Sequence, residues 1–286
     1  MILIVDSGST KSDWLAVDNN GNKLLEKIRT KGLNPAILAE KKLVKRIKKS
    51  NDLKNNSEKV THVFFYGAGC GTENARELLV TVLKSIFINA HIEVNEDTLA
   101  AVYSTINHPK EAAVVCILGT GSNCSYYDGE VLHQRVKSLG YSLMDDASGN
   151  YYGKQLIRDY YFNHMPENVK LAFGSKYNMD ADFIKYNLYK QPSPNAYLAN
   201  FAEFMFLHKD SEYTINLIKK GVRLFANNMI MQFKEELKTV PVHFAGSIAY
   251  FAQKEINEVA DEMGFKVGNF ERRPIDGLVP FHTKDL

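Results

Sequence analysis

The chain has 286 residues, of which 45% are hydrophobic, 24% charged and 11% aromatic, a composition typical of globular proteins. This composition excludes a disordered, collagen-like or low-complexity chain. The 35 basic and 33 acidic residues give a net charge of +2, so no whole-molecule field recruits nucleic acid or anionic lipid. At roughly 150 residues per domain, the length predicts one or two domains.

Cysteine content and apolar patterning predict a cytoplasmic protein. The three cysteines are odd in number and show no CxxC spacing, which argues against a disulfide scaffold and a zinc ribbon. They fit a reducing compartment. No segment approaches the roughly 18 apolar residues that span a bilayer, and the short apolar run 1–5 lacks the flanks of a signal peptide. We therefore expect neither a membrane nor a nucleic acid as partner.

The first part of the chain predicts strands that end in polar or glycine-rich turns. Residues 2–5 and 14–17 are expected to form a β-hairpin around the turn that begins at Asp6. Residues 37–50 predict a basic amphipathic helix. We interpret its lysines as a solvated face rather than an RNA site, because no aromatic platform accompanies them. The predicted elements that follow are a strand at 60–66, a helix at 73–88, a strand at 90–95 and a helix near 98–106.

The second part of the chain repeats the opening pattern. An apolar strand at 112–118 runs into the turn 119–123, and a second strand and an Asp-Gly turn follow. We interpret this repeat as an internal duplication, which predicts two related domains, 1–110 and 111–286. Helical periodicity over about 151–237, strongest at 211–237, indicates an insertion in the second domain. The predicted closing elements are a strand at 240–245, a helix at 248–263 and a strand at 265–270.

Two turns have the composition of phosphate-binding loops. In Asp6-Ser7-Gly8-Ser9-Thr10-Lys11, glycine lets the backbone approach an anion, while hydroxyl, amide and ammonium groups supply donors and charge. Asp6, at the end of a strand, suits Mg²⁺ held partly through water. A plain hairpin turn is the other interpretation of this loop. Gly119-Thr120-Gly121-Ser122-Asn123 is the second loop, and the matched pair favours phosphate binding.

Three further segments carry polar groups at expected helix starts. Asp97 follows a strand and opens a helix, so it is either an N-cap or a general base for phosphoryl transfer. Asp145 and Asp146, in the glycine-bounded segment 140–149, suit sugar hydroxyls or a metal, or cap the next helix. Gly246-Ser247 places a helix N-terminus after a strand, where it can lie close to a nucleotide.

Three familiar enzyme classes are disfavoured by particular residues. An aspartic protease needs two carboxylates, but Leu118 stands where the duplicated half should supply the second. A dinucleotide-binding turn needs Gly or Ala at its third glycine position, which Thr72 occupies in the turn 67–72. The segment 149–155 is one residue short of a Walker A loop and lacks its Ser or Thr.

In chain order, these motifs resemble those of the sugar kinase/Hsp70/actin (ASKHA) superfamily. Within it, the chain is most similar to the BadF/BadG/BcrA/BcrD-type ATPases and the N-acetylglucosamine kinases. The turns at 6–12 and 119–123 resemble the two phosphate loops, and 245–247 the adenosine motif. The segment 145–149 resembles Asp-Glu-Gly-Ser-Gly, with Asp146 for Glu and Ala147 for Gly.

The resemblance implies an α/β protein of two RNase-H-like domains, of the actin/hexokinase type, with mixed sheets flanked by helices. It implies an ATP cleft between these domains, whose closure excludes water. It further implies Mg²⁺-dependent transfer of the γ-phosphoryl group of ATP to the 6-hydroxyl of an amino sugar. N-acetylglucosamine is the first candidate sugar, beside glucosamine and N-acetylmuramate. A homodimer is the default oligomeric expectation.

The resemblance also assigns roles to residues. Asp97 falls where the family keeps its catalytic base, and Asp6 is our candidate for the metal. The residues expected to contact ATP are Gly8, Ser9, Thr10, Lys11, Thr120, Gly121, Ser122, Gly246 and Ser247. The residues expected to contact or line the sugar are Asn34, Asp97, Asn123, Ser138, Gly140 and Asp145.

Two other functions remain open at this point. One is an ATPase activator of a dehydratase or reductase, whose relatives hold an iron–sulfur cluster at a dimer interface. The three cysteines here lack that family's cysteine-bearing motif. The other is a non-catalytic protein that senses a sugar or nucleotide, or an actin-like assembly protein.

Overall fold

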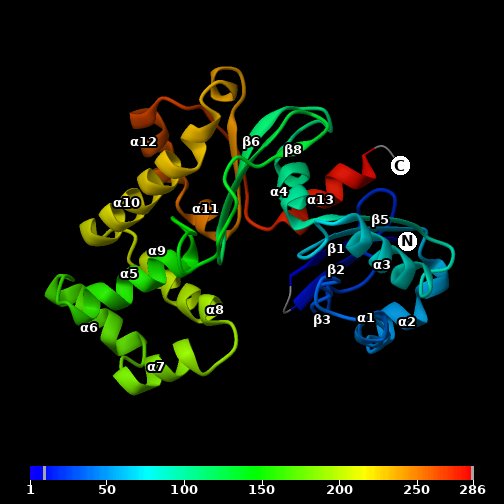
Figure 1. Ribbon diagram of the computed structural model, residues 1–286, viewed down its shortest axis with the longest axis horizontal. Coiled ribbons are helices and arrows are strands. Elements are labelled where there is room, and N and C mark those ends of the chain that lie inside the picture. The colour runs from blue at the N-terminus through cyan, green and yellow to red at the C-terminus, as the bar shows by residue number, and fades with distance from the viewer. Residues whose placement is uncertain (9–10, 285–286) are drawn as a thin grey trace. The chain divides into compact units, whose positions relative to one another are not determined.

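The structure is a computed structural model, which describes residues 1–8 and 11–284. Ser9 and Thr10, which we expected to contact phosphate, lie outside the described residues. The chain divides into two compact units, each drawn in Figure 1. Unit 1 is Met1–Pro109 with Arg273–Leu286, and unit 2 is Lys110–Arg272.

Unit 1 is built on a five-stranded mixed sheet with the order β3-β2-β1-β4-β5. Its strands are β1 (Ile2–Ser7), β2 (Lys11–Val17), β3 (Ile28–Lys31), β4 (His62–Gly67) and β5 (His91–Glu96). Its helices are α1 (Glu40–Lys48), α2 (Asn51–Asn55), η1 (Ser57–Lys59), α3 (Glu73–Lys84), α4 (Asp97–Thr105) and α13 (Pro274–Thr283). The predicted opening hairpin is confirmed, since β1 and β2 pair antiparallel.

Side chains alternate between the two faces of this sheet, and both faces are covered by helices. Leu3 and Val5 of β1 pack with Trp14 in a core that includes residues of α1 and α3. Ile2 and Ile4 face the other way and pack with residues of α4 and α13. β1 is therefore the central strand of unit 1, and its carboxyl end is held in place by packing on both sides.

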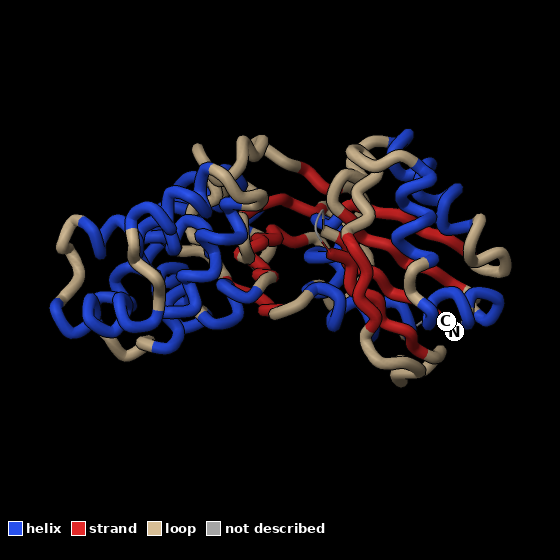
Figure 2. Tube along the Cα trace, turned by 90° about the horizontal axis from the view of Figure 1, so that it is seen from below, coloured by secondary structure: helices blue, strands red, loops and turns tan. Residues whose placement is uncertain are grey.

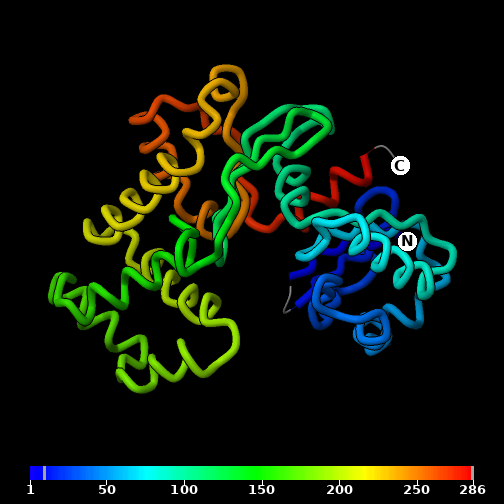
Figure 3. Tube along the Cα trace, viewed as in Figure 1, coloured from blue at the N-terminus to red at the C-terminus, as the bar shows by residue number. Residues whose placement is uncertain are grey.

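The C-terminal helix α13 completes unit 1 rather than unit 2. It lies beside α4 in Figure 1, and a Cβ at Gly277 would lie 2.7 Å from the Cβ of Ser104. The Tyr66 hydroxyl on β4 is 2.7 Å from Nε2 of His282 on α13. We expected the second domain to extend to residue 286, and this packing corrects that boundary. Both ends of the chain thus belong to unit 1, as the colours of Figure 3 show.

Unit 2 has a second five-stranded sheet, with the order β10-β9-β6-β7-β8. Its strands are β6 (Ala113–Leu118), β7 (Ser122–Tyr127), β8 (Leu132–His133), β9 (Val242–Ala245) and β10 (Val267–Glu271). In each unit the first strand pairs antiparallel with the second and parallel with the fourth, which pairs parallel with the fifth. This shared topology confirms the duplication and the two-domain fold that the sequence predicts.

Helices make up most of the remainder of unit 2, shown in blue in Figure 2. Those before the fourth strand are α5 (Gly149–Tyr161), α6 (Glu167–Lys176), α7 (Ala181–Tyr189), α8 (Pro194–Ala199), η2 (Asn200–Ala202), α9 (Glu203–Leu207), α10 (Glu212–Asn228), η3 (Ile230–Phe233) and η4 (Glu236–Lys238). Those after it are α11 (Ser247–Phe251) and α12 (Gln253–Met263). The predicted helix at 211–237 ends at Asn228, and short 3₁₀ turns follow it.

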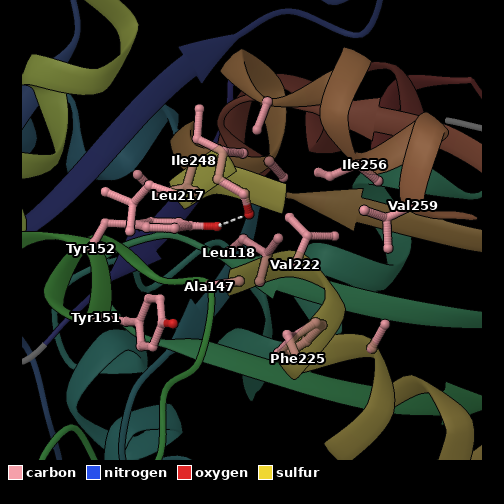
Figure 4. Packing of buried hydrophobic residues seen from close by; sticks show 14 of the residues in the cluster. Leu118, Ala147, Tyr151, Tyr152, Leu217, Val222, Phe225, Ile248, Ile256 and Val259 are labelled. Atoms are coloured by element: carbon pink, nitrogen blue, oxygen red, sulfur yellow. Dashed lines mark hydrogen bonds between the residues drawn. The ribbon is translucent and has the colours of Figure 1, made fainter. Parts of the chain in front are cut away.

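Helices α5 and α10 pack closely in the core of unit 2 (Figure 4). The Tyr152 hydroxyl of α5 donates a hydrogen bond of 2.9 Å to the carbonyl oxygen of Ile218. Any Cβ at Gly221 would lie 2.6 Å from that hydroxyl, so α10 needs glycine there. Ala147, just before α5, is fully buried in the same cluster. The loop 145–148 is thereby anchored to the core.

Candidate active site

The site residues of unit 1 gather at the carboxyl ends of three parallel strands. The register pairs Ser7 of β1 with Gly67 of β4, and Gly67 with Glu96 of β5. Because parallel strands end at one edge of the sheet, the residues that follow them meet there. Ligands of α/β proteins bind outside this edge. Asp6 and Ser7 at the end of β1, the turn 67–71 and Asp97 therefore lie at one edge of the sheet.

Two carboxyl groups at this edge are raised in pKa. Asp6 has a pKa of about 6, mainly because of burial and then because of the neighbouring Asp97 and Asp13, while Lys11 and Lys27 oppose the shift. The pKa of Asp97 is also raised, mainly by desolvation of its carboxyl group by the surrounding chain, although the residue itself stays accessible to solvent. Desolvation strengthens a carboxylate as a proton acceptor, so Asp97 has the property that a general base needs.

Asp97 is the first residue of α4, and Glu96 holds the N-cap position without a side-chain cap. The N-cap interpretation of Asp97 is therefore wrong. Its carboxylate instead interacts with the backbone N–H groups of Thr98 and of Asp97 itself, which partly offset the raised pKa. The N-terminus of α4 thus orients this carboxylate at the sheet edge.

Asn34 is fixed against the same edge by a chain of short contacts. The Ser7 hydroxyl lies 2.7 Å from the Ser12 hydroxyl and accepts a hydrogen bond of 3.1 Å from the backbone N–H of Leu33. This draws the segment 32–35 onto β1. A Cβ at Gly69 would lie 2.0 Å from Oδ1 of Asn34, so only glycine fits beside it. Unit 1 therefore brings the predicted sugar residue Asn34 to the edge that carries Asp6 and Asp97.

The site residues of unit 2 surround the turn between β6 and β7. The backbone N–H of Gly119 donates a hydrogen bond of 2.9 Å to the carbonyl oxygen of Gly121. The backbone N–H of Gly149 donates one of 2.7 Å to the carbonyl oxygen of Gly119. A Cβ at Gly121 would lie 2.8 Å from Oδ2 of Asp145, and one at Gly246 would lie 2.4 Å from a backbone carbonyl of β6. The second phosphate loop therefore touches both the Asp145 loop and the predicted adenosine motif.

A pocket of about 210 Å³ in unit 2 gathers three predicted residues: Ser122, Ser138 and Asp145. Asp146 and Asn228 also line it. The other two predicted sugar residues of unit 2 are placed differently. Asn123 lies on β7, where its Oδ1 accepts a hydrogen bond of 2.9 Å from the Ser125 hydroxyl. Gly140 forms the turn before Asp145, with φ +82°, and does not line this pocket.

Two asparagines that the sequence did not single out support this pocket. Asn150 is fully buried, and its Nδ2 donates to the Thr120 carbonyl at 2.6 Å and to Oδ2 of Asp145 at 2.9 Å. Its Oδ1 has no hydrogen-bond partner. Asn228, at the end of α10, donates to Oδ2 of Asp146 at 2.9 Å. Asn150 directly follows the Asp145–Gly149 motif, which is the one sequence signal that marks it.

A larger pocket of about 800 Å³ adjoins Ser247, the second residue of the predicted adenosine motif. Ile248, Phe251 and Arg272 also line it. The Arg272 guanidinium lies over the Phe251 ring, 4.8 Å from its centre. Apolar and planar surfaces with a few polar groups suit an aromatic heterocycle.

Comparisons with known proteins identify the family. A candidate N-acetylglucosamine kinase from Porphyromonas gingivalis is 31% identical, over 100% of this chain and 99% of its own, with a TM-score of 0.89. This chain belongs to the same sugar kinase family. A scan against protein-family models and a search of the curated proteins gave no match.

More distant structures share the sugar kinase fold. A second candidate N-acetylglucosamine kinase, from Chromobacterium violaceum, has 14% identity and a TM-score of 0.67, over 98% of each chain. A ROK family glucokinase from Streptomyces griseus, in complex with glucose and AMPPNP, also has 14% identity and a TM-score of 0.67, over 98% of this chain and 97% of its own. The narrower assignment to BadF-type ATPases stays a prediction.

Mg²⁺, which the resemblance implies, would need few protein ligands among the acids of unit 1. The described residues contain no group of three His, Cys, Asp or Glu side chains arranged for a metal. Mg²⁺ does not need one, because it binds through one or two carboxylates together with substrate phosphates and water. Asp6, a carboxyl group whose pKa is raised to about 6 mainly by burial, is the acid of this edge that could serve as such a ligand.

The cysteines do not support an iron–sulfur cluster. All three are buried, Cys70 in unit 1 and the other two in unit 2. Cys116 and Cys124 lie directly opposite each other on β6 and β7, with their sulfur atoms 3.4 Å apart inside the core. This placement disfavours the activator interpretation, which needs cysteines at a dimer interface.

Among the described residues, no helix is long and apolar enough to cross a bilayer.

Proposed function

We propose that the protein is an ATP-dependent kinase that phosphorylates the 6-hydroxyl of an amino sugar, with N-acetylglucosamine as the first candidate. The observation that carries the proposal is Asp97, a carboxylate of raised pKa that interacts with Asp6 at the carboxyl edge of the sheet and is accessible to a substrate. Membership of the sugar kinase family, through a relative named as a candidate N-acetylglucosamine kinase, supports the substrate class.

In this proposal, Asp97 accepts the proton of the sugar 6-hydroxyl as the hydroxyl oxygen bonds to the γ-phosphorus of ATP. The bond from that phosphorus to the bridging oxygen breaks, and ADP leaves. Asn34, held against Gly69, orients the sugar by hydrogen bonding. Asp6 would help to hold Mg²⁺, which when bound would supply charge neutralisation for the transferred group. Most of the catalysis is then positioning and electrostatics, as is general for phosphoryl transfer.

The residues of unit 2 serve the same reaction. The glycine-rich turn 119–121 offers backbone N–H groups to the ATP phosphates. Asp145, steadied by Asn150, binds sugar hydroxyls through charged hydrogen bonds. The adenine ring occupies the pocket beside Ser247 and Phe251. The AMPPNP in the Streptomyces griseus glucokinase supports ATP as the phosphoryl donor.

The experiment that tests this proposal is coupled ADP release with Mg·ATP and a panel of sugars. The panel contains N-acetylglucosamine, glucosamine, N-acetylmuramate, N-acetylmannosamine and glucose. Asp97→Asn keeps the shape of the side chain but removes the base, so we expect a loss of activity of at least a hundredfold. Glu96→Gln changes the charge of the adjacent residue and is the matched control, for which we expect retained activity. Equal activity in both variants contradicts the role of Asp97.

A further inference from the structure

A groove of about 1000 Å³ lies in unit 1 between helix α1 and the edge strand β3. None of the residues predicted to bind ATP or the sugar lines it. Eight Lys or Arg residues line it and only one acid, Asp52. The groove therefore carries a charge of +7 on a chain whose net charge is +2, so the rest of the chain carries −5. Positive charge is concentrated here rather than spread over the surface.

Some of these cations are already engaged. Arg29 binds Asp13 at 2.7 Å, and Lys27 lies 3.6 Å from the same carboxylate. Arg46 donates to the carbonyl oxygen of Gly32. The other five groove lysines form no ion pair within residues 1–8 and 11–284. They are Lys31, Lys41, Lys42, Lys45 and Lys49, all of them exposed.

The lysines of α1 repel one another. Lys41, Lys45 and Lys49 follow at intervals of four residues, so they lie in one row along the helix and its C-cap. Like charges at this spacing destabilise a helix, and the only acid within α1 is Glu40. α1 is held instead by its buried Leu43 and Ile47. Lys31 of β3 adds a further cation at the other wall. An anion between the two walls would relieve this repulsion.

The lining indicates what kind of anion fits. It contains no aromatic side chain on which a nucleobase could stack, which disfavours single-stranded nucleic acid. Its volume lies at the upper end of the range for small-molecule sites. Lysines act as point charges toward phosphate, and several of them in a row match several linked phosphates. We propose that this groove binds a small soluble ligand that carries a chain of phosphate groups.

From the sequence alone, the lysines of this helix are interpreted as a solvated face. The structure adds the opposite wall, which comes from a strand that the sequence did not predict. The proposal does not depend on kinase activity, because the groove and the candidate active site share none of their assigned residues.

The test is calorimetric titration of the full-length protein with inorganic tripolyphosphate; binding at a nucleotide site would persist in a variant of the groove lysines, and binding in the groove would not. The groove variant is Lys41→Gln/Lys45→Gln/Lys49→Gln. Its matched control, Lys23→Gln/Lys54→Gln/Lys84→Gln, makes the same charge change at exposed lysines of unit 1 outside the groove. We expect the groove variant to bind about tenfold or more weakly, since each exposed ion pair contributes a few-fold. The control should bind like the wild type.

A second variant, Lys31→Gln, tests the opposite wall and should also weaken binding, because only a ligand inside the groove contacts both elements. Raising the salt concentration should weaken wild-type binding. The proposal is overturned if the groove variant binds like the wild type or if orthophosphate binds as tightly as tripolyphosphate. Tighter binding of a single-stranded RNA or of a glutamate-rich peptide likewise overturns it.

Discussion

We predict that the ionised carboxylate of Asp6, which belongs to the candidate active site, destabilises the ligand-free protein. The Asp6 carboxyl group has a pKa of about 6, because it is largely removed from water and is repelled by the charges of Asp97 and Asp13. At pH 8 the folded chain must therefore carry an ionised carboxylate where ionisation is disfavoured. Asp6→Asn keeps the size and shape of the side chain and removes the charge. We expect this variant to be more stable than the wild type at pH 8 and inactive as a kinase.

The size of the effect follows from the shift in pKa. The ordinary value of 3.8 is raised to about 6, and each unit corresponds to about 1.4 kcal/mol. The side chain keeps some exposure to solvent, which screens part of this energy. We therefore expect the free energy of unfolding of Asp6→Asn to exceed that of the wild type by about 1–3 kcal/mol at pH 8.

The pH dependence has a definite sign. Because the folded pKa is raised, folded Asp6 binds more protons than unfolded Asp6 between the two values. The wild type therefore gains stability as the pH falls from about 6 toward 4, and the advantage of the variant shrinks over that interval. Below both pKa values the carboxyl is neutral in both states, and the electrostatic difference disappears.

Unit 1 supplies its own reporter for this measurement. Trp14 is the single tryptophan of the chain and is fully buried in the core of that unit. Urea unfolding followed by Trp14 fluorescence between pH 4 and pH 8 therefore reports on the unit that contains Asp6. Asp52→Asn, at an exposed position in the same unit, is the control and should change stability by less than about 0.5 kcal/mol. A pH-independent difference, or a less stable Asp6→Asn at pH 8, refutes the reasoning.

Four further predictions concern single positions. Ala147 has φ +57° and is fully buried, so Ala147→Gly relieves backbone strain but removes a buried methyl group. We expect it to lower stability by no more than about 1 kcal/mol in thermal unfolding, and Ala147→Val to lower it by more. Asn150→Ala frees the Asp145 carboxylate and should raise KM for the sugar more than KM for ATP; an equal rise in both contradicts this. Gly69→Ala should cost about 1–3 kcal/mol and weaken sugar binding, because its Cβ meets Asn34. Burial lowers the pKa of His282 to about 4, so stability should fall as pH drops from 6.5 toward 4, and less so in His282→Phe.

The sequence predicted the strand-and-turn framework because its signals are local. Apolar β-branched runs that end in glycine-rich turns at 2–8 and 112–121 mark both first strands and the turns predicted to bind phosphate. The repeat of this unit was sufficient to predict two related domains. The position of Asp97 was likewise visible, since a strand leads directly into its helix.

Elements stabilised by tertiary packing were not predictable in this way. Helix α13 contains Gly277 and Pro280, which local propensity places outside helices, and it forms because it packs on α4. Strand β3 is short and largely polar, and it forms only as the edge partner of β2. Helix α13 of the first domain and strand β3, which forms one wall of the groove beside α1, therefore could not be predicted from sequence periodicity.

The supporting residues of the site were missed for the same reason. Asn150 matters because its side chain reaches both the Thr120 carbonyl and Asp145, and the contact with Thr120 spans thirty residues. Asn228 reaches Asp146 from the far end of another helix. Asparagine at the start or end of a helix has no local pattern that distinguishes these roles from ordinary surface positions.

The central claim is transfer of a phosphoryl group to the 6-hydroxyl of an amino sugar with Asp97 as base. The most direct test is ³¹P and ¹H NMR of the products formed from Mg·ATP and N-acetylglucosamine by the wild type, Asp97→Asn and Glu96→Gln. We expect ADP and N-acetylglucosamine 6-phosphate in equal amounts with the wild type and Glu96→Gln, and neither product with Asp97→Asn. ADP accompanied only by inorganic phosphate, or phosphorylation that persists in Asp97→Asn, would contradict it.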